Sequence, residues 1–347
     1  MPPLSLKIKK NLANQHKIYI VLGNTSADMD SVMSSFAYAN GMGPSFFPLI
    51  NVDRADLLLR KDVLYVLDIA ALNCDAFFFR EDVPHLTELA KQGNAAFVLI
   101  DHNRLDPRQK ELAPFVERIL DHHRDEESGY PAHKIIRSVG STATIVAQQL
   151  LKLHPEKITA QTAFMLLSAI LLDTKDLKDP GKTTSQDTAV AELLKEKSGR
   201  LYTDQLYAVL QKKRQEVDIQ RPDHILRKDF KIYEDPRIYY GISSLPRGVE
   251  WGPQNTATWL KAVVHFLPEE KIDLWIGLVD KESGKELILY SPHLWEALMK
   301  YIPSSSLNQI LSFTASLPEL NLLFYKLNKP LARKELQPML SFPVNCA

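Results

Sequence analysis

The stretch Val116-Glu117-Arg118-Ile119-Leu120-Asp121-His122-His123 puts an acid and two imidazoles directly after an apolar run that reads as a β-strand. Acids follow three further apolar runs in the same way, which indicates that these side chains share one site. The three are Asp28-Met29-Asp30 after 18–22, Asp101-His102-Asn103 after 97–100, and Asp173 after 166–172.

Short apolar or β-branched runs alternate with longer segments of helical period over roughly the first 195 residues, which is typical of a parallel sheet covered by helices. We therefore expect an α/β fold with a doubly wound, mostly parallel sheet. Gly140-Ser141-Thr142 suits a helix start, because a hydroxyl can cap the free N–H groups. The expected strands are 18–22, 46–50, 63–67, 96–100, 116–120 and 132–136, and the expected helices are 30–40, 83–92, 141–153, 159–172 and 184–197.

A polar stretch, Lys195-Glu196-Lys197-Ser198-Gly199-Arg200, interrupts this pattern. A chain of 347 residues is long enough for two domains that each bury a core. We predict domains over 1–198 and 199–347, the second a smaller α+β domain. Its expected strands are 238–243, 272–279 and 286–290, and its expected helices are 256–266 and 293–301.

The charges balance, with 42 Lys and Arg against 42 Asp and Glu. No global field therefore attracts nucleic acid or a membrane, and an anionic ligand would need a local basic cluster. The two cysteines, Cys74 and Cys346, form no disulfide framework, which favours a reducing compartment. The N-terminus has no signal-type apolar segment, and the apolar run 164–172 is too short to span a bilayer. We expect a soluble cytoplasmic protein.

The four polar motifs should meet at one edge of the sheet, because ligands of open α/β sheets bind beyond the carboxyl ends of the strands. Carboxylates crowded in a dry site raise one another's pKa, and a divalent cation relieves their repulsion. A mixture of carboxylates and imidazoles suits Mg²⁺ or Mn²⁺, with Co²⁺ and Zn²⁺ as alternatives. Two such ions about 3.5–4 Å apart can activate a water near neutral pH, so the pattern favours phosphoryl transfer to water.

Each motif alone has an ordinary structural explanation. An Asp-x-Asp pair can cap a helix or close a turn, and a His-His pair can be a buried polar pair. Asp173 alone would most simply be a surface acid at the end of a helix. The metal site is favoured because all four motifs would otherwise share one sheet edge by accident.

In combination, the motifs resemble the DHH phosphoesterase family, in the branch with a DHHA2 C-terminal domain. This branch holds manganese-dependent inorganic pyrophosphatases, eukaryotic-type exopolyphosphatases and prune-like proteins. The resemblance implies that Asp101 bridges two divalent metal ions, that His123 faces the substrate phosphate, and that Asp121 orients the imidazoles. The metal ligands that it implies are Asp28, Asp30, Asp101, His122 and Asp173.

Two positions separate the subgroups of this branch. Bacterial pyrophosphatases have histidine where this chain has Asn24, whereas exopolyphosphatase-like and prune-like members have asparagine. An amide is a weak ligand for a transition metal, so one metal site should be weaker and more tolerant of Mg²⁺. We place Asn24 among the substrate-binding residues. Prune-like members commonly carry arginine at the last position of the third motif, so the intact His123 favours an exopolyphosphatase.

A neutral protein that acts on polyanions needs cations at its site. Arg227-Lys228-Asp229-Phe230 resembles a basic element of the family's second domain, and Ala332-Arg333-Lys334 resembles its Ser-Arg-Lys element with Ala in place of Ser. Arg333 can grip a phosphate with two N–H groups, while Lys228 and Lys334 act as point charges. A less specific set of lysines follows the fourth motif: Lys175, Lys178 and Lys182.

The resemblance implies an exopolyphosphatase that uses two metal ions and releases orthophosphate from the ends of inorganic polyphosphate. Domain 1–198 would hold the metal ions, and domain 199–347 would close over them with its cations. We expect no nucleic acid and no membrane as partners, and a monomer or weak dimer. The catalytic residues implied are Asp101, His123, Lys228, Arg333 and Lys334.

Several alternatives stay open at this point. An inorganic pyrophosphatase would use the same chemistry in a shorter pocket. A prune-like protein would act on short polyphosphates or cyclic nucleotides, and a regulatory protein would bind without turnover. A single-strand exonuclease of the wider family is expected to carry Gly-rich elements in its second domain, which the sequence of residues 220–347 lacks.

Overall fold

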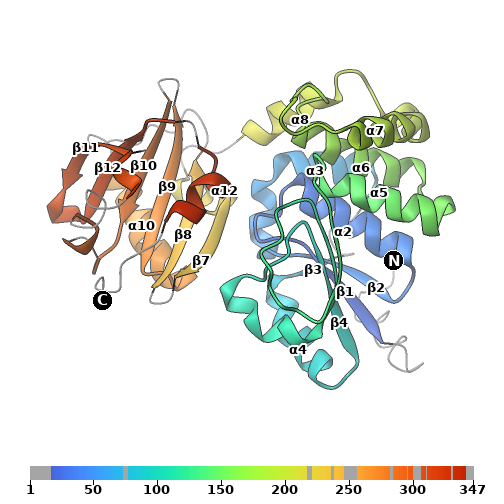
Figure 1. Cartoon of the computed structure of the whole chain (residues 1–347), viewed down its shortest axis with the longest axis horizontal. Helices are drawn as coiled ribbons and strands as arrows, with labels where there is room; N and C mark the ends of the chain where they lie inside the picture. The colour runs from blue at the N-terminus through green and yellow to red at the C-terminus, as the bar shows by residue number, and fades with distance from the viewer. Residues whose placement is uncertain are drawn as a thin grey trace. The chain divides into compact units, whose positions relative to one another are not determined.

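The computed structural model describes residues 17–72, 77–216, 221–235, 238–245, 256–281, 284–294, 296–299, 306–309, 311–329 and 331–340. The chain forms two compact units, Met1–Glu216 and Val217–Ala347 (Figure 1). The boundary expected from the sequence lies at the end of α7 (Ser185–Ser198), whereas this division follows α8 (Leu206–Gln215). Both cysteines lie outside the described residues.

A six-stranded parallel sheet forms the centre of the first unit, in the order β3-β2-β1-β4-β5-β6. The chain passes outward from β1 to β3, then crosses to β4 and continues in the other direction, so β1 and β4 flank the point where ligands bind in such sheets. The doubly wound parallel sheet predicted from the sequence is confirmed. The strands are β1 (Ile18–Leu22), β2 (Phe46–Ile50), β3 (Phe78–Phe79), β4 (Ala95–Ile100), β5 (Val116–Asp121) and β6 (His133–Ile136).

Helices cover both faces of this sheet (Figure 1). Val21 of β1 packs into the core under α2, α5 and α6, whereas its neighbours Ile20 and Leu22 pack into the core under α4 and the 3-10 segment η4. Helix α6 is buried from Thr162 to Leu172, because α2, α5, α7 and α8 pack around it. The bounds are α2 (Met29–Met42), α4 (Val83–Lys91), η4 (Pro107–Phe115), α5 (Thr142–Leu153) and α6 (Ala160–Asp173).

One predicted strand of the first unit is wrong. Residues 63–67 belong to a helix, α3 (Lys61–Ile69). Their β-branched composition favours a strand, but Val63, Val66 and Leu67 are spaced three and four residues apart and are all buried on one helix face. That face packs against α2 and α8, so tertiary packing decides the conformation. The strand that pairs with β2 is instead the short β3.

The second unit contains a mixed six-stranded sheet in the order β11-β12-β10-β9-β8-β7, which confirms the smaller α+β domain. All neighbouring strands are antiparallel except β8 and β9, which are parallel and connected through α10 (Thr256–Glu270). Strands β7, β11 and β12 and helix α9 were not predicted from the sequence. The elements are α9 (Pro222–Lys228), β7 (Phe230–Asp235), β8 (Ile238–Leu245), β9 (Leu274–Lys281), β10 (Gly284–Tyr290), β11 (Leu311–Leu317), β12 (Leu322–Leu327) and α12 (Arg333–Leu336).

The two described tryptophans of the second unit are packing residues. Trp259 and Trp275 are buried in the core between the sheet and α10, and the Trp275 indole N–H donates to Ser243 Oγ at 2.9 Å. A buried indole commonly finds such a partner for its one donor. Neither tryptophan therefore offers an exposed ring for stacking on a base.

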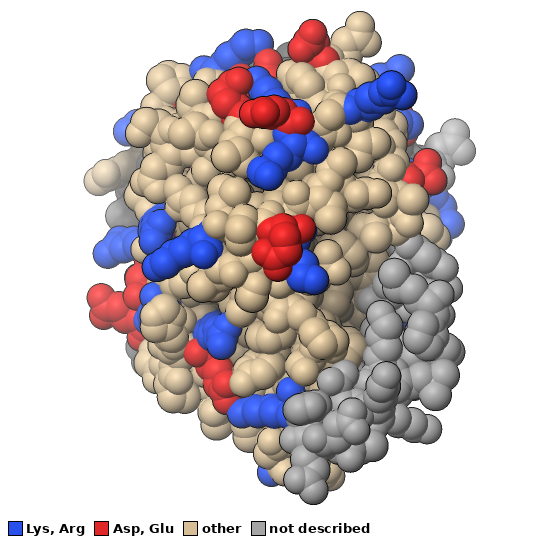
Figure 2. Space-filling model, turned by 90° about the vertical axis from the view of Figure 1, so that its right-hand side faces the viewer, with Lys and Arg blue, Asp and Glu red and all other residues tan. Residues whose placement is uncertain are grey.

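The surface mixes charges of both signs. On the face shown in Figure 2, Lys and Arg side chains are interspersed with Asp and Glu side chains, in keeping with the zero net charge. Across the described part of the chain, every helix is too short or too polar to cross a membrane.

Candidate metal centre

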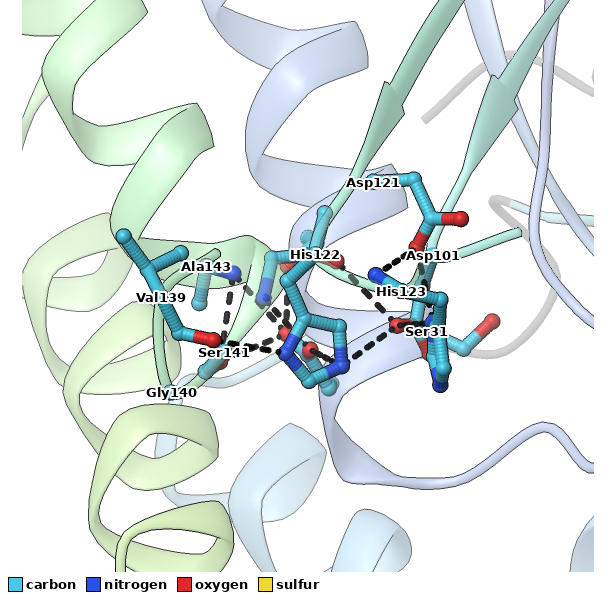
Figure 3. A network of polar contacts seen from close by, with 12 residues as sticks. Ser31, Asp101, Asp121, His122, His123, Val139, Gly140, Ser141 and Ala143 are labelled. Carbon is cyan, nitrogen blue, oxygen red and sulfur yellow. Dashed lines mark hydrogen bonds and ion pairs between the residues drawn. The ribbon is translucent and has the colours of Figure 1, made fainter. Parts of the chain in front are cut away.

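The four polar motifs meet at the carboxyl edge of the parallel sheet. Asp101 directly follows β4, and Asp121 is the last residue of the neighbouring strand β5. Asp28 caps the N-terminus of α2, and Asp173 is the last residue of α6. Strand ends and helix ends thus bring together side chains that are far apart in the sequence, as Figure 3 shows for Asp101, Asp121 and their neighbours.

His122 presents its Nε2 atom to two carboxylates. Its Nδ1 lies 3.1 Å from the carbonyl oxygen of Val139, and because a carbonyl can only accept, Nδ1 carries the proton (Figure 3). Nε2 lies 3.5 Å from Asp101 Oδ1 and 3.9 Å from Asp30 Oδ2. Burial lowers the pKa of His122, although Asp30 opposes this effect. The neutral ring therefore directs a lone pair at the acids, as a metal-binding imidazole does.

Asp30 is fixed by donors on both carboxylate oxygens. Oδ1 accepts from Ser34 Oγ at 3.0 Å, Ser141 Oγ at 2.8 Å and Ala143 N at 2.9 Å, and Oδ2 accepts from Thr142 N at 2.7 Å. Three of these donors come from the start of α5, where free N–H groups and the helix dipole favour an anion. The helix end thus sets the orientation of this carboxylate.

Asp101 is held between Asn24 and Thr142. The Asn24 side-chain nitrogen donates to Asp101 Oδ2 at 2.6 Å, and Thr142 Oγ1 donates to Oδ1 at 3.1 Å. The side-chain carbonyl oxygen of Asn24, Oδ1, accepts instead from the backbone N–H of Ser26 at 2.8 Å. In this arrangement the amide nitrogen of Asn24, and not its carbonyl oxygen, faces Asp101.

The acids are crowded enough to disturb one another. Burial raises the pKa of Asp101 well above its usual range, and the charges of Asp30 and Asp28 add to the effect. Burial, Asp30 and Asp28 likewise raise the pKa of Asp173 well above its usual range. Buried carboxylates of this kind are stabilised by a cation placed among them.

Among the described residues, two overlapping groups of side chains could hold a divalent metal ion, with ligand atoms within 4.8 Å of one another. Asp101, His122 and His123 form one group, and Asp30, His122 and Asp173 form the other. The mixture of carboxylate oxygens and an unprotonated imidazole nitrogen fits such an ion. Asp28 is outside both groups, and its Oδ1 accepts from Ser31 N at 3.1 Å.

Asp121 holds His123. His123 Nδ1 lies 2.7 Å from Asp121 Oδ1, and the other carboxylate oxygen accepts from the Asn103 side chain at 2.6 Å. Burial works to raise the pKa of Asp121, but the hydrogen bonds and charge of His123 outweigh it and lower the pKa to about 2. Asp121 is therefore an anion that orients His123, while the Val139 carbonyl orients His122.

Backbone strain gathers at the same edge. Ala27 and Asp101 have φ values of 46° and 64°, in the left-handed region that side chains other than glycine rarely adopt. The three residues 175–177, which closely follow Asp173, lie in that region as well. Strained backbone persists where surrounding contacts enforce it, and it is concentrated at functional sites.

Two of the three lysines after the fourth motif form ion pairs within their own loop. Lys175 Nζ lies 2.7 Å from Asp179, and Lys178 Nζ lies 2.7 Å from Asp176. No ion pair is formed by Lys182 among the residues that the structure describes. Arg214 of α8 and Lys182 both oppose the rise in the pKa of Asp173, and no local sequence pattern singles out Arg214.

The two basic segments of the second unit lie against each other. Arg333 Nη1 donates to the backbone oxygen of Asp229 at 2.7 Å, and Nη2 donates to Asp229 Oδ1 at 2.8 Å. Lys228, which precedes Asp229, is 7% exposed at the end of α9. Lys334 follows in α12, and its side chain lies outside the described residues.

The segment Val139–Ala143 is the part of the site that the sequence did not reveal as functional. It supplies contacts to His122, Asp30 and Asp101 through backbone groups and two hydroxyls. Only the capping signal at Gly140-Ser141-Thr142 marked it, because backbone donors carry no sequence signature.

Comparison with known proteins agrees with this arrangement. Residues 17–170 match the DHH family, N-terminal domain, and residues 208–341 match the DHHA2 domain. A "Putative exopolyphosphatase" of Schizosaccharomyces pombe is 30% identical over 293 residues, covering 78% of this chain and 75% of that protein. "Exopolyphosphatase PRUNE1" of Rattus norvegicus is 28% identical over 357 residues, covering 95% of this chain and 76% of that protein.

One solved structure shares the fold along the chain. It is the crystal structure of a Methanococcus jannaschii "putative family II inorganic pyrophosphatase", with a TM-score of 0.61 and 20% sequence identity, and the match covers 95% of this chain and 98% of that one. The chain therefore belongs to the DHH family and carries a DHHA2 domain after its DHH domain.

Proposed function

We propose that this chain is a metal-dependent exopolyphosphatase, which hydrolyses the terminal phosphoanhydride bond of inorganic polyphosphate and releases orthophosphate. The observation that supports this most directly is the group of acids and imidazoles at the carboxyl edge of the first sheet. It occurs in a chain of the DHH family with relatives that are named exopolyphosphatase.

Two divalent ions per chain, Mg²⁺ or Mn²⁺, with Co²⁺ or Zn²⁺ as substitutes, suit the donor set. Asp30, His122 and Asp173 would hold one ion, and Asp101 and Asp28 would complete the pair of sites, with Asp101 shared between them. Ions bound there would offset phosphate charge and lower the pKa of a bound water. The protein fixes the ligands beforehand through the start of α5.

His123 is proposed to meet the phosphate. Its Nδ1 is engaged by Asp121, which leaves Nε2 as the ring atom that can approach a phosphate oxygen. Its side chain is 33% exposed, against 14% for His122. The anionic Asp121 fixes the orientation of the ring through Nδ1, and a fixed imidazole suits a residue that transfers a proton at the leaving phosphate. We also place Asn24 near the substrate, beside Asp101.

The second unit is proposed to supply cations to the substrate through Lys228, Arg333 and Lys334. The contact between Arg333 and Asp229 supports this, because it joins two basic segments that are 104 residues apart in the sequence. Asp229 fixes one edge of the guanidinium group, and a fixed arginine loses less side-chain entropy when it binds a phosphate.

The test is orthophosphate release with Mg²⁺ or Mn²⁺ from long-chain polyphosphate, tripolyphosphate and pyrophosphate, with residual chain length followed on a gel. Release from the polymers with pyrophosphate left intact is expected. Preference for pyrophosphate would make the chain an inorganic pyrophosphatase. Inactivity on all three, in a protein that still binds Mn²⁺, would refute both, and cyclic nucleotides would be tried next.

A further inference from the structure

A single segment orients three of the candidate metal ligands. The Val139 carbonyl holds His122, and the N–H groups of Thr142 and Ala143 hold Asp30. The Thr142 hydroxyl also holds Asp101. The position of this segment therefore determines how well these ligands are arranged before a metal ion binds.

Asp187, in the first turn of α7, anchors that segment from behind. Its side chain is 0% exposed. Oδ2 accepts from the backbone N–H of Gly140 at 2.8 Å, and Oδ1 accepts from Thr144 Oγ1 at 2.6 Å. Oδ2 also accepts from the backbone N–H and the hydroxyl of Thr184 at 2.8 and 2.6 Å.

Helix capping explains only half of these contacts. The bond from the backbone N–H of Thr184 belongs to the capping box of α7, and the bond from the Thr184 hydroxyl joins the same two capping residues. The bonds from Gly140 and Thr144 come from the start of another helix, α5, and α7 does not need them in order to begin. Asp187 thus joins α7 to the segment that carries the ligand contacts.

The packing around Gly140 leaves no room for a side chain at this position. A Cβ atom at this position would lie 2.5 Å from Thr174 Cγ2 and 3.0 Å from Asp187 Oδ2. Thr174 directly follows the candidate ligand Asp173. The loop around Gly140 is therefore packed closely between Thr174, at the end of α6, and Asp187. The same packing constrains the residue next to Asp173.

We propose that Asp187 is a positioning residue of the metal centre. Among the described residues it forms no hydrogen bond with a candidate ligand, and it acts by fixing Val139–Ala143 so that this segment presents its carbonyl, N–H and hydroxyl groups to His122, Asp30 and Asp101. The inference rests on the proposed metal centre but not on the identity of the substrate.

The test is an Mn²⁺ titration of the full chain without substrate, in which free Mn²⁺ is followed by its electron paramagnetic resonance signal. Asp187→Ala should weaken Mn²⁺ binding about tenfold or more, the effect typical of removing an outer contact of a metal site. The Mn²⁺ dissociation constant of Asp187→Asn should stay within about threefold of that of the parent chain. The amide oxygen can still accept from Gly140 N–H, and the Thr144 hydroxyl, which can accept as well as donate, can accept from the amide NH₂ group.

Thr159→Ala is the matched control. Thr159 caps α6 through Thr162 N, at the end of the helix opposite Asp173, about 20 Å away along 14 residues. It should lower the melting temperature as the loss of a cap does and leave Mn²⁺ affinity unchanged. A folded Asp187→Ala chain with parent affinity would overturn the proposal.

A second variant covers the case in which Asp187→Ala does not fold. Gly140→Ala keeps the Asp187 carboxylate but pushes the segment away from it, so it should weaken Mn²⁺ binding by a similar factor. Parent-like affinity in a folded Gly140→Ala chain would overturn the proposal. If the parent chain itself bound no Mn²⁺, the metal centre would fail together with this inference, whereas Mn²⁺ binding without polyphosphate hydrolysis would leave the inference standing.

Discussion

Asp101 combines burial, a left-handed backbone and neighbouring acids, so its carboxylate costs free energy in the metal-free chain. Asparagine tolerates the same backbone conformation and can keep both hydrogen bonds, to Asn24 and Thr142. We expect Asp101→Asn to lower kcat/KM for polyphosphate by roughly a thousandfold or more, because it removes the carboxylate proposed to be shared by the two metal ions. In EDTA, urea unfolding should show a variant more stable by about 1–3 kcal/mol. An active variant would remove Asp101 from the metal centre.

The same substitution isolates the pH dependence of stability. The pKa of Asp101 is raised in the folded chain, so its destabilising effect is absent at low pH and grows as the pH rises through that raised value. Asparagine does not titrate. The stability difference between Asp101→Asn and the parent chain, measured in EDTA, should therefore widen with rising pH and close as the pH falls. A difference that is independent of pH would show that folding does not shift the pKa of Asp101.

Arg333 allows a residue-scale test in the second unit. Lysine keeps the positive charge but cannot donate to the Asp229 backbone and side chain while gripping a phosphate with two N–H groups. Arg333→Lys should raise KM for polyphosphate about tenfold with a smaller effect on the melting temperature. Arg221→Lys is the control, because Arg221 forms an exposed ion pair with Asp223. Equal KM values for the two variants would count against a phosphate contact at Arg333.

Among the helices and strands, those that could be predicted from the sequence are the ones whose residue pattern is compatible with a single type of secondary structure. Strands β1 and β4 are uninterrupted apolar runs, and a strand buried on both faces explains them. Helix α3 was mistaken for a strand because the unbroken apolar run 63–67 is compatible with either structure, and the packing of α2 and α8 decides between them. The short β3 depends on pairing with β2, which a local pattern does not contain.

In the candidate site, too, the residues set by local sequence could be predicted and those set by packing could not. Its acids and imidazoles could be predicted because they stand at strand ends and helix ends that a parallel sheet brings together. Asp187 could not be predicted, because its role arises from the packing of α7 against α5 and leaves no local pattern. The backbone contacts of Val139–Ala143 likewise depend on position and not on side-chain type.

The three lysines in the loop between α6 and α7 differ in their ion pairs, and this difference can be tested. Lys175 and Lys178 are paired with acids of the same loop, so their charges are already balanced. Lys182 is exposed, and its charge acts on Asp173. Lys182→Ala should raise KM for long polyphosphate several-fold, whereas Lys175→Ala and Lys178→Ala should stay within about twofold, as for other surface ion pairs. Steady-state kinetics that gave the reverse order would place the substrate away from Lys182.

For the whole molecule, the metal ligands and the tryptophans report on different units. All candidate ligands lie in Met1–Glu216, whereas all four tryptophans lie between residues 251 and 295. Mn²⁺ should therefore raise the melting temperature of the first unit, followed by far-UV circular dichroism, by several degrees at about a hundredfold excess over its dissociation constant. The transition followed by tryptophan fluorescence should not move. A shift of both signals would mean that the two units unfold together.

The position of the candidate metal centre along the chain bears on the order of events during synthesis of the protein. Its candidate ligands end at Asp173, the anchor follows at Asp187, and the unit that contains them ends at Glu216. Domains tend to fold as units, with the N-terminal one first during synthesis. The nascent chain would thus complete the candidate metal centre before the C-terminal unit has been translated, so that supply of the ion, and not completion of the polypeptide, would set when the centre forms.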